Sequence, residues 1–268
     1  MKSTRARSLV VVILGIVLFS GQSHAQQEFD RERYYRAVEY CRGNVSRPMA
    51  LSPDGQVLCF DGFIEADLDI SLARKLKENG LFVVRSNGGS SLTAVALSDV
   101  VRDRRAAVIV HDHCFSACAL YFLIASYQTY VLKGALVAWH HLQSRDPGDP
   151  FCTYLIELRD GEPRKLQRGP CQAGGEQGAK LWPELARFFE ERVNPSFDPP
   201  PDSPYVRRIV RNYYAQTGVF HDVAWTLHPR YYPVLFKTKI FYEAYPQSQD
   251  EVDRMAAWLG RVRVIYDP

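Results

Sequence analysis

Apolar residues between positions 56 and 140 follow two alternating patterns: short runs rich in β-branched residues, and longer stretches with helical spacing. The short runs predict strands at Gln56–Phe60, Leu81–Val84, Ala106–Val110, Thr129–Leu132 and Leu136–Trp139. The longer stretches predict helices at Leu68–Asn79, Leu92–Val101 and Cys118–Ala125. Strands that alternate with helices in this way indicate an α/β fold with a mostly parallel sheet.

The segments on either side of this core, residues 56–145, have different patterns. We expect residues 26–55 to form an N-terminal arm. Its charged, Tyr-rich beginning is typical of a short helix or of a loosely held arm without regular structure. Residues 146–180 are rich in Pro and Gly and interrupt the alternation, which predicts an inserted loop region. Residues 181–268 return to helical spacing, so we expect a C-terminal helical region that completes the domain.

The first 25 residues contain the three parts of a secretory signal peptide. A basic start is followed by the apolar run Leu9–Phe19, and small residues precede the expected cleavage after Ala25. A retained membrane anchor is the rival interpretation, but the run is shorter than the roughly twenty residues that span a bilayer. We therefore expect a periplasmic or secreted protein with no membrane span in its mature form.

The formal net charge of +3 belongs to this leader, where Lys2, Arg5 and Arg7 have no acidic counterpart. The remainder of the chain is therefore neutral overall. A protein that binds nucleic acid by neutralising many phosphates needs a basic face, so we expect no nucleic-acid partner. Hydrophobic residues make up 46% of the chain, which is typical of a packed globular protein.

Six cysteines follow the expected cleavage site, an even number that fits an oxidising compartment. Proximity along the chain favours the disulfides Cys41–Cys59, Cys114–Cys118 and Cys152–Cys171. The last of these would tie the insertion of residues 146–180. Structural zinc is the rival interpretation, but no two cysteines have the C-x2-C spacing typical of such sites. The C-x3-C spacing also differs from the C-x-x-C motif of thioredoxin-like enzymes.

Two loops that follow predicted strands carry the residues with the clearest chemistry, Ser86–Ser90 and His113–Cys118. Adjacent glycines in the first loop allow backbone N–H groups to approach a ligand without obstruction by Cβ atoms. Ser116 in the second loop opens a predicted helix, whose first amides also point outward. Such an arrangement can supply a nucleophile and an oxyanion hole, with His140 at the end of a later strand as the base.

Each of these features also has a purely structural explanation when it is taken alone. Adjacent glycines are common in turns, Ser116 suits the N-cap of a helix, and His140 at a strand end suits a packed core histidine. Their occurrence together favours an active-site-like pocket.

The order strand, S-x-G-G, helix, strand, C-x-S-A-C, helix, strand, W-H resembles the Clp protease proteolytic subunit and crotonase-like superfamily. It is most similar to an exported, cysteine-containing branch of predicted periplasmic proteins. The resemblance covers roughly Val57–His141. It implies a fold of repeated ββα units, and because family members often form rings or trimers, it makes a homo-oligomer one expectation.

Carried over to this chain, the resemblance implies that Ser116 is the nucleophile and His140 the general base, with His141 as the reserve candidate. The amides of Gly89 and Ala117 would hold the oxyanion, and Gly88 would shape the same backbone element. The implied reaction is acyl transfer from a peptide or another acyl substrate. No cofactor is expected.

Two departures from the family pattern bear on activity. Asn87 replaces the usual Pro in the first loop, which changes the stiffness of the turn. No acid stands at the family's position after Thr217-Gly218, and the nearby carboxylate, Asp222, comes too early. The alternatives are a dyad that works without an acid, a substitute such as Asp222, and a protein without catalytic activity.

The motif His111-Asp112-His113 raises a metal-binding alternative, because alternate residues of a strand face the same way. It lacks a third ligand at a recognisable spacing, so we expect no metal. Two functions follow from the sequence. The first is an exported serine hydrolase, and the alternative is a non-catalytic periplasmic binding protein with a degenerate active site.

Overall fold

A computed structural model describes the protein at residues 30–45, 48–140, 151–159, 162–170, 175–217, 223–260 and 262–268. The folded body is the unit Glu32–Pro268. The expected signal peptide, residues 1–25, lies outside the described residues. Within the described part of the chain, no helix is both long enough and apolar enough to cross a membrane.

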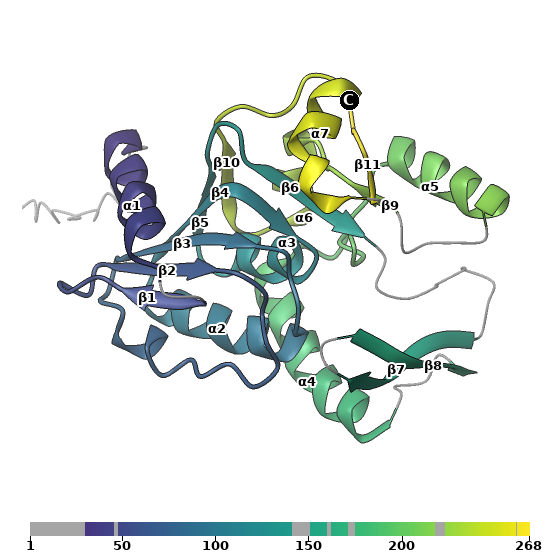
Figure 1. Ribbon diagram of the computed structural model, residues 1–268, viewed down its shortest axis with the longest axis horizontal. Coiled ribbons are helices and arrows are strands. Elements are labelled where there is room, and N and C mark those ends of the chain that lie inside the picture. The colour runs from purple at the N-terminus through teal and green to yellow at the C-terminus, as the bar shows by residue number, and fades with distance from the viewer. Residues whose placement is uncertain are drawn as a thin grey trace, which may run out of the picture. The chain divides into compact units, whose positions relative to one another are not determined.

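The chain forms helices and strands in alternation (Figure 1). The α-helices are α1 (Arg31–Asn44), α2 (Ser91–Asp103), α3 (Ala117–Tyr121), α4 (Gly175–Arg192), α5 (Pro204–Thr217), α6 (Tyr232–Leu235) and α7 (Gln249–Met255). The strands before residue 146 are β1 (Met49–Leu51), β2 (Val57–Asp61), β3 (Leu81–Ser86), β4 (Ala107–Phe115), β5 (Gln128–Val131) and β6 (Leu136–His140). The later strands are β7 (Phe151–Arg159), β8 (Glu162–Pro170), β9 (Val223–Trp225), β10 (Lys239–Tyr242) and β11 (Arg263–Ile265).

The main sheet has the order β1-β2-β3-β4-β6-β9-β11, and β5 with β10 branches from β4. The branch arises because the long strand β4 pairs with β5 through Val108–Val110 and with β6 through His113–Phe115. Only the pairs β1–β2 and β6–β9 of this sheet are antiparallel among the described strands. The prediction of an α/β fold with a mostly parallel sheet is therefore confirmed.

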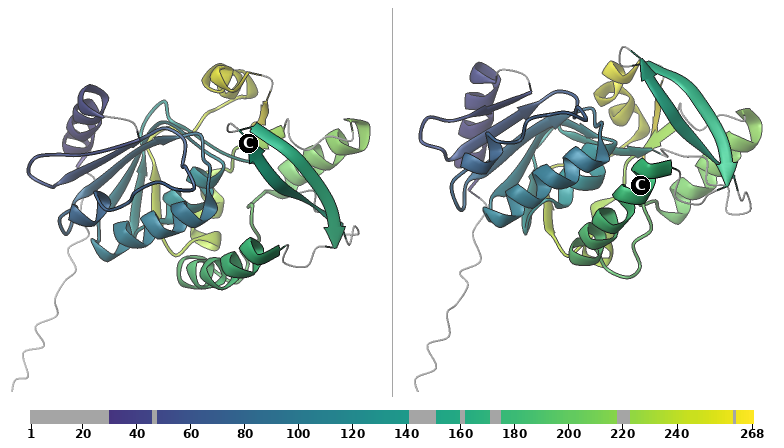
Figure 2. Two further views of the ribbon diagram at one scale, coloured as in Figure 1. Left: turned by 60° about the horizontal axis from the view of Figure 1, so that its bottom comes forward. Right: turned by 90° about the horizontal axis from the view of Figure 1, so that it is seen from below.

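Side chains that alternate along the strands divide the core between the two faces of the sheet. On one face Phe82, Val84 and Val110 belong to a large buried cluster that also includes Leu97 of α2 and Phe188 of α4. Helices α2 and α4 lie on this side of the sheet, and α1 and α7 lie on the other side (Figure 2).

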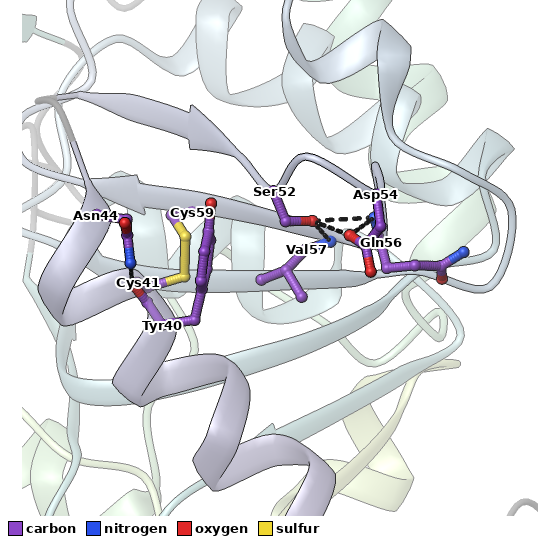
Figure 3. Close-up of a disulfide and its surroundings, with 8 residues drawn as sticks. All are labelled: Tyr40, Cys41, Asn44, Ser52, Asp54, Gln56, Val57 and Cys59. Atoms are coloured by element: carbon purple, nitrogen blue, oxygen red, sulfur yellow. Dashed lines mark hydrogen bonds between the residues drawn. A yellow bond between two sulfur atoms is a disulfide. The ribbon is translucent and has the colours of Figure 1, made fainter.

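The opposite face is closed by α1 near one end of the sheet. The ring of Tyr34 in α1 lies 4.5 Å, centre to centre, from that of Tyr130 in β5. A disulfide joins Cys41 of α1 to Cys59 of β2 (Figure 3). The residues on either side of Cys59, Leu58 and Phe60, belong to the large cluster. The described part of the expected arm, residues 26–55, thus contains a helix, one of the two alternatives for its beginning, and this helix is covalently joined to the sheet.

The β1–β2 turn shows why these two short strands meet in register. The Ser52 hydroxyl oxygen accepts hydrogen bonds from the amides of Gln56 and Val57, at 3.1 and 2.9 Å (Figure 3). Gly55 takes a φ of 73°, in the left-handed region that glycine adopts at little cost. The turn therefore satisfies its own backbone and fixes the entry into β2.

The predicted helix at Leu68–Asn79 is wrong, because this segment contains only the short 3₁₀ helix Ala73–Lys75. The Asp69 carboxylate accepts hydrogen bonds from both the amide and the hydroxyl of Ser71, at 2.8 and 2.9 Å. Local bonds of this kind compete with helical backbone bonds. The apolar spacing reflects burial of Ala73 and Leu76 in the core instead.

The expectation that residues 181–268 are helical is incomplete, because β9, β10 and β11 join the main sheet. Each has three or four residues, too few for an alternating pattern to stand out in the sequence. The predicted loop region at 146–180 contains an antiparallel pair, β7 with β8. Helix α5 lies within the expected C-terminal helical region, and α4 begins earlier, at Gly175, inside the segment expected to be a loop.

Two of the three predicted disulfides, Cys41–Cys59 and Cys114–Cys118, are present. The third prediction, Cys152–Cys171, falls partly outside the described residues because Cys171 is not among them.

We expect removal of the Cys41–Cys59 link, in the double variant Cys41→Ala/Cys59→Ala, to lower the free energy of unfolding by about 3 kcal/mol. The link spans 18 residues, so it restricts the unfolded chain more than Cys114–Cys118, which spans 4. The matched variant Cys114→Ala/Cys118→Ala should lose about 2 kcal/mol. Urea denaturation of both measures the difference, and a larger loss in the second variant would contradict this ranking.

Candidate functional site

The site lies where β3, β4 and β6 end and α3 begins. Ser116 follows the last residue of β4 and precedes the first residue of α3. Its backbone has φ 59° and ψ −122°, a combination that L-residues with a side chain rarely adopt. Such a sharp strand-to-helix turn presents the side chain of its central residue away from both elements, as in nucleophile elbows.

Two neighbouring strands fix the positions of Ser116 and His140 relative to each other. Strands β4 and β6 are parallel and pair Phe115 with Ala138. The Ser116 amide continues the ladder by donating to the Ala138 carbonyl at 3.1 Å. Two residues further along β6, His140 brings its Nε2 atom to 2.7 Å from Ser116 Oγ. The two residues selected from the sequence therefore form a hydrogen-bonded pair.

The turn Ser86–Ser90 lies directly against the Ser116 turn. A methyl group placed on Gly88 would be 2.6 Å from Ser116 Cβ and 2.8 Å from the Ala117 nitrogen. One placed on Gly89 would be 2.3 Å from the Ile64 carbonyl oxygen. Gly88 and Gly89 also have positive φ values of 90° and 136°. Both positions thus require glycine on steric and conformational grounds.

The backbone amides where the two turns meet differ in whether they already donate a hydrogen bond within the protein. The Gly88 N–H donates to Ser86 Oγ at 3.1 Å, and the Gly88 carbonyl accepts from the Ile64 amide at 2.8 Å. Within the described residues, the amides of Gly89 and Ala117 have no hydrogen-bond acceptor. Gly88 therefore shapes the backbone, and the other two amides are the candidates for binding an oxyanion.

The disulfide Cys114–Cys118 brackets Ser116 in the sequence C-F-S-A-C. Cys114 belongs to β4 and Cys118 to α3, so the link ties together the two elements that flank the turn. Both cysteines are completely buried in the large cluster. The covalent link restricts the separation of strand and helix, and with it the conformation of the turn.

Two further candidates from the sequence cannot be placed relative to Ser116 and His140. His141, the reserve base, and Asp222, the candidate acid, both lie outside the described residues. Strand β9, which begins at Val223, pairs with β6 so that Ala224 stands opposite His140. The role of Asp222 stays a prediction.

A different buried carboxylate, Asp267, is engaged elsewhere. Its two oxygens accept hydrogen bonds from the Ser203 hydroxyl at 2.6 Å and from the His228 amide at 2.9 Å. The His228 Nδ1 atom accepts from the amide of Arg230 at 3.1 Å. Asp267 therefore anchors the C-terminal segment to the Ser203 side chain and to the backbone of His228.

The motif His111-Asp112-His113 occupies a bulge of β4, where Asp112 has a φ of 54°. The Asp112 carboxylate contacts Arg42 of α1 at 2.9 Å and Arg85 of β3 at 3.3 Å. Arg85 also forms a bidentate pair with Asp61 at the end of β2. Within the described part of the chain, no group of three or more His, Cys, Asp or Glu residues is arranged to hold a metal ion.

An aromatic stack beside the dyad was not foreseen from the sequence. The ring of Phe115 lies parallel to that of His140, with 4.9 Å between centres and 12° between planes. Trp258, in the 3₁₀ helix Ala257–Leu259, stacks on His113 at 4.0 Å. Trp258 also meets Phe115 edge-on at 6.3 Å. Sequence offers no sign of these contacts, because Trp258 is remote from β4 along the chain.

A polar pocket that does not include Ser116 or His140 lies between α2 and α4. Asp99 lines it and pairs with Arg187 at 2.5 Å and with Arg192 at 2.6 Å. Arg187 pairs in addition with Glu191, and the Arg192 guanidinium lies over the Phe188 ring. These charges partner one another across the two helices, which fits a role in holding α4 against α2.

We expect Gly88→Ala to destabilise the fold by about 1–3 kcal/mol more than Gly134→Ala. Both glycines have similar positive φ values, 90° and 82°, so both variants have similar backbone strain. Only Gly88 faces a close contact, since nothing lies within 4 Å of a methyl group at Gly134. Chemical denaturation measures the difference, and equal losses would show that the Gly88 contact yields without cost.

We expect His113 to make the fold sensitive to acid. Burial, with the nearby charge of Arg85, lowers the pKa of His113 to about 4. Its unfolded value is about 6.5, so the unfolded chain binds the proton more readily, and stability falls as the pH drops from 6.5 to 4. The ring is partly exposed, which limits the loss to about 1 kcal/mol.

The variant His113→Phe keeps an aromatic ring and does not titrate. Urea denaturation at pH 7 and at pH 4.5 should show a smaller loss on acidification for this variant than for the wild type. An identical pH dependence in the two proteins would contradict the assignment of this acid sensitivity to His113.

Comparison with known proteins yields no relative from which a role could be transferred. No protein-family model matches the chain. A search among curated proteins also finds no match. The function is therefore argued from the geometry of the site.

Proposed function

We propose that the protein is a serine hydrolase that transfers an acyl group to Ser116 and then to water. The observation that carries the proposal is the 2.7 Å contact between Ser116 Oγ and His140 Nε2. It occurs at a residue whose strained backbone presents its hydroxyl outward from a strand-to-helix turn. Backbone strain of this kind is concentrated at functional sites.

In the first half of the reaction, the neutral His140 accepts the hydroxyl proton of Ser116 at Nε2 while Oγ attacks the substrate carbonyl carbon. The tetrahedral intermediate then collapses, and the protonated His140 gives its proton to the leaving group. In the second half, His140 removes a proton from water, which attacks the acyl-enzyme ester and releases Ser116. Each proton taken by His140 is returned, so the side chains end in their starting state.

The amides of Gly89 and Ala117 would stabilise the negative charge that develops on the carbonyl oxygen. Ala117 is the first residue of α3, where a helix leaves its amides without internal partners. The Gly88 contact keeps the first loop beside the Ala117 nitrogen. Loss of one such donor typically costs 10²–10³ in rate, so two fixed amides are a substantial part of the proposed mechanism.

The ending of β3 at S-x-G-G, the C-x-S-A-C turn after β4 and the His at the end of β6 keep the order of the Clp and crotonase-like superfamily. We include membership of that superfamily, with its repeated ββα units, in the proposal. A homo-oligomer is part of the same expectation. The substrate would be a peptide or another acyl compound.

Export forms a further part of the proposal. It is supported by the pattern of residues 1–25 and by the two disulfides, which persist in oxidising compartments. The Cys114–Cys118 link in particular would keep the Ser116 turn intact in the periplasm or outside the cell.

The acid of a complete triad would be Asp222. It immediately precedes β9, whose Ala224 pairs with His140. A triad predicts that Asp222→Asn slows acylation by several orders of magnitude, as loss of the acid does in other serine hydrolases. A self-sufficient dyad predicts little change, so this variant distinguishes the two forms of the mechanism.

The proposal predicts that a fluorophosphonate probe labels the mature, oxidised protein at Ser116. Labelling should disappear in Ser116→Ala, because the nucleophile is lost. It should slow by about 10²–10⁴ in His140→Ala, because the hydroxyl loses its base. Mass spectrometry of the labelled peptide identifies the modified residue, and gel fluorescence gives the rate.

Ser248→Ala and His228→Ala provide matched controls. Ser248 also opens a helix, α7, where its hydroxyl accepts from the Glu251 amide at 3.2 Å, and His228 is bound to backbone atoms. Both variants should be labelled at the wild-type rate. Absence of labelling in the wild type, or labelling that survives Ser116→Ala, would refute the hydrolase and favour a non-catalytic binding protein.

A further inference from the structure

The rings of Phe115 and Trp258 connect His140, the proposed general base, to the C-terminal part of the chain. Phe115 is the last residue of β4 and the immediate neighbour of Ser116. Its ring covers one face of the His140 imidazole, with the planes only 12° apart. The Trp258 ring stands at 88° to that of Phe115, with 6.3 Å between ring centres, so Phe115 has aromatic contacts with both His140 and Trp258.

The backbone on both sides of this stack is fixed. Phe115 and Ala138 are register partners, and His140 follows Ala138 by two residues on β6. Because alternate residues of a strand share a face, Leu136, Ala138 and His140 point to the same side of the sheet. His140 is held in turn by the pairing of β6 with β9.

The Phe115 ring is itself packed in a second buried cluster, on the face of the sheet that carries α7. Six buried residues make up this cluster: Leu136, Ala138, Ala224, Val252, Ala256 and Val264. Phe115 and Leu259 pack against it. A ring held by this cluster has little freedom to move away from His140.

With its backbone fixed, the His140 ring moves relative to Ser116 by rotation of the His140 side chain. Rotation about the Cβ–Cγ bond would tilt the imidazole edge into the face of Phe115, which lies at stacking distance. The observed ring plane, which avoids this collision, is the one in which Nε2 lies 2.7 Å from Ser116 Oγ.

We infer that Phe115 is a positioning residue that holds the plane of His140 in the reactive orientation, and that Trp258 supports Phe115 in that role. The inference rests on the proposed function, and it adds residues that the sequence motif does not supply. Phe115 acts through His140, so its removal should slow the acylation step with little effect on substrate binding. A displacement of reacting groups by about 1 Å is enough to cost on the order of a hundredfold in rate.

The test compares Phe115→Leu, Phe115→Tyr and Trp258→Leu with the wild type in fluorophosphonate labelling and in hydrolysis of p-nitrophenyl acetate. Phe115→Leu should lower the acylation rate constant and kcat by about 10- to 100-fold and change KM by less than about threefold. Phe115→Tyr keeps the ring and should remain within about threefold of the wild type. Trp258→Leu should cause a smaller loss than Phe115→Leu, because it acts one ring further away.

Phe236→Leu is the matched control for loss of a packed ring, since Phe236 is 5% exposed and belongs to the large cluster instead. It should lower the thermal midpoint at least as much as Phe115→Leu and leave the labelling rate unchanged. The inference is overturned if folded Phe115→Leu reacts at the wild-type rate, or if Phe115→Tyr is as slow as Phe115→Leu.

Nuclear magnetic resonance of ¹³C-histidine-labelled protein provides a readout that does not need activity. The His140 ring signals, assigned by their loss in His140→Ala, should carry a ring-current shift that disappears in Phe115→Leu and persists in Phe236→Leu. Unchanged His140 signals in Phe115→Leu would overturn the inference. If the fluorophosphonate probe fails to react with the wild type but the ring-current shift behaves as expected, the hydrolase is refuted and the Phe115–His140 stack is retained. The two failures are therefore distinguishable.

Discussion

The site depends on one close backbone contact, the approach of Gly88 to the turn that contains Ser116. A side chain at position 88 would collide with Ser116 Cβ and with the amide of Ala117, so the two loops can meet only because glycine is there. The contact requires β3 and β4 to be neighbours, which their parallel pairing provides. It also requires a turn that leaves β4 sharply, and Ser116 achieves this with a positive φ. The strain of that turn is offset by the disulfide across it and by complete burial of α3.

The two members of the dyad are supported by different parts of the core. Ser116 opens α3, whose residues belong to the cluster on the α2 side of the sheet. His140 and Phe115 lie toward the smaller cluster on the α7 side. The sheet between them is the common frame, since β4 carries Ser116 and β6 carries His140. The two residues that form the 2.7 Å contact are thus supported from opposite sides of the sheet.

The strands of the core could be predicted because they follow from local patterns. Ser116 and His140 were expected to meet because of their places at the ends of predicted elements and the resemblance to the Clp and crotonase-like superfamily. Buried parallel strands are rich in β-branched residues, and their ends mark the loops that carry chemistry. The helix predicted at Leu68–Asn79 is wrong because the apolar spacing there reflects burial, while the Asp69 carboxylate accepts hydrogen bonds from the amide and the hydroxyl of Ser71. The strands β9 to β11 are too short to show a period. Trp258 reaches Phe115 through tertiary packing of a remote segment, which no local pattern encodes.

The C-terminal region thus contributes to the geometry of the Ser116–His140 pair. Strand β9 closes the free edge of β6 and fixes the backbone of His140, and β11 pairs with β9 in turn. Helix α7 and the following turn place Val252, Ala256 and Trp258 over the same face. A core that ended at β6 would leave His140 on an edge strand, where the backbone has fewer restraints. The segment after β8 therefore restrains Ser116 and His140, the proposed nucleophile and base on adjacent strands, to the geometry in which they meet.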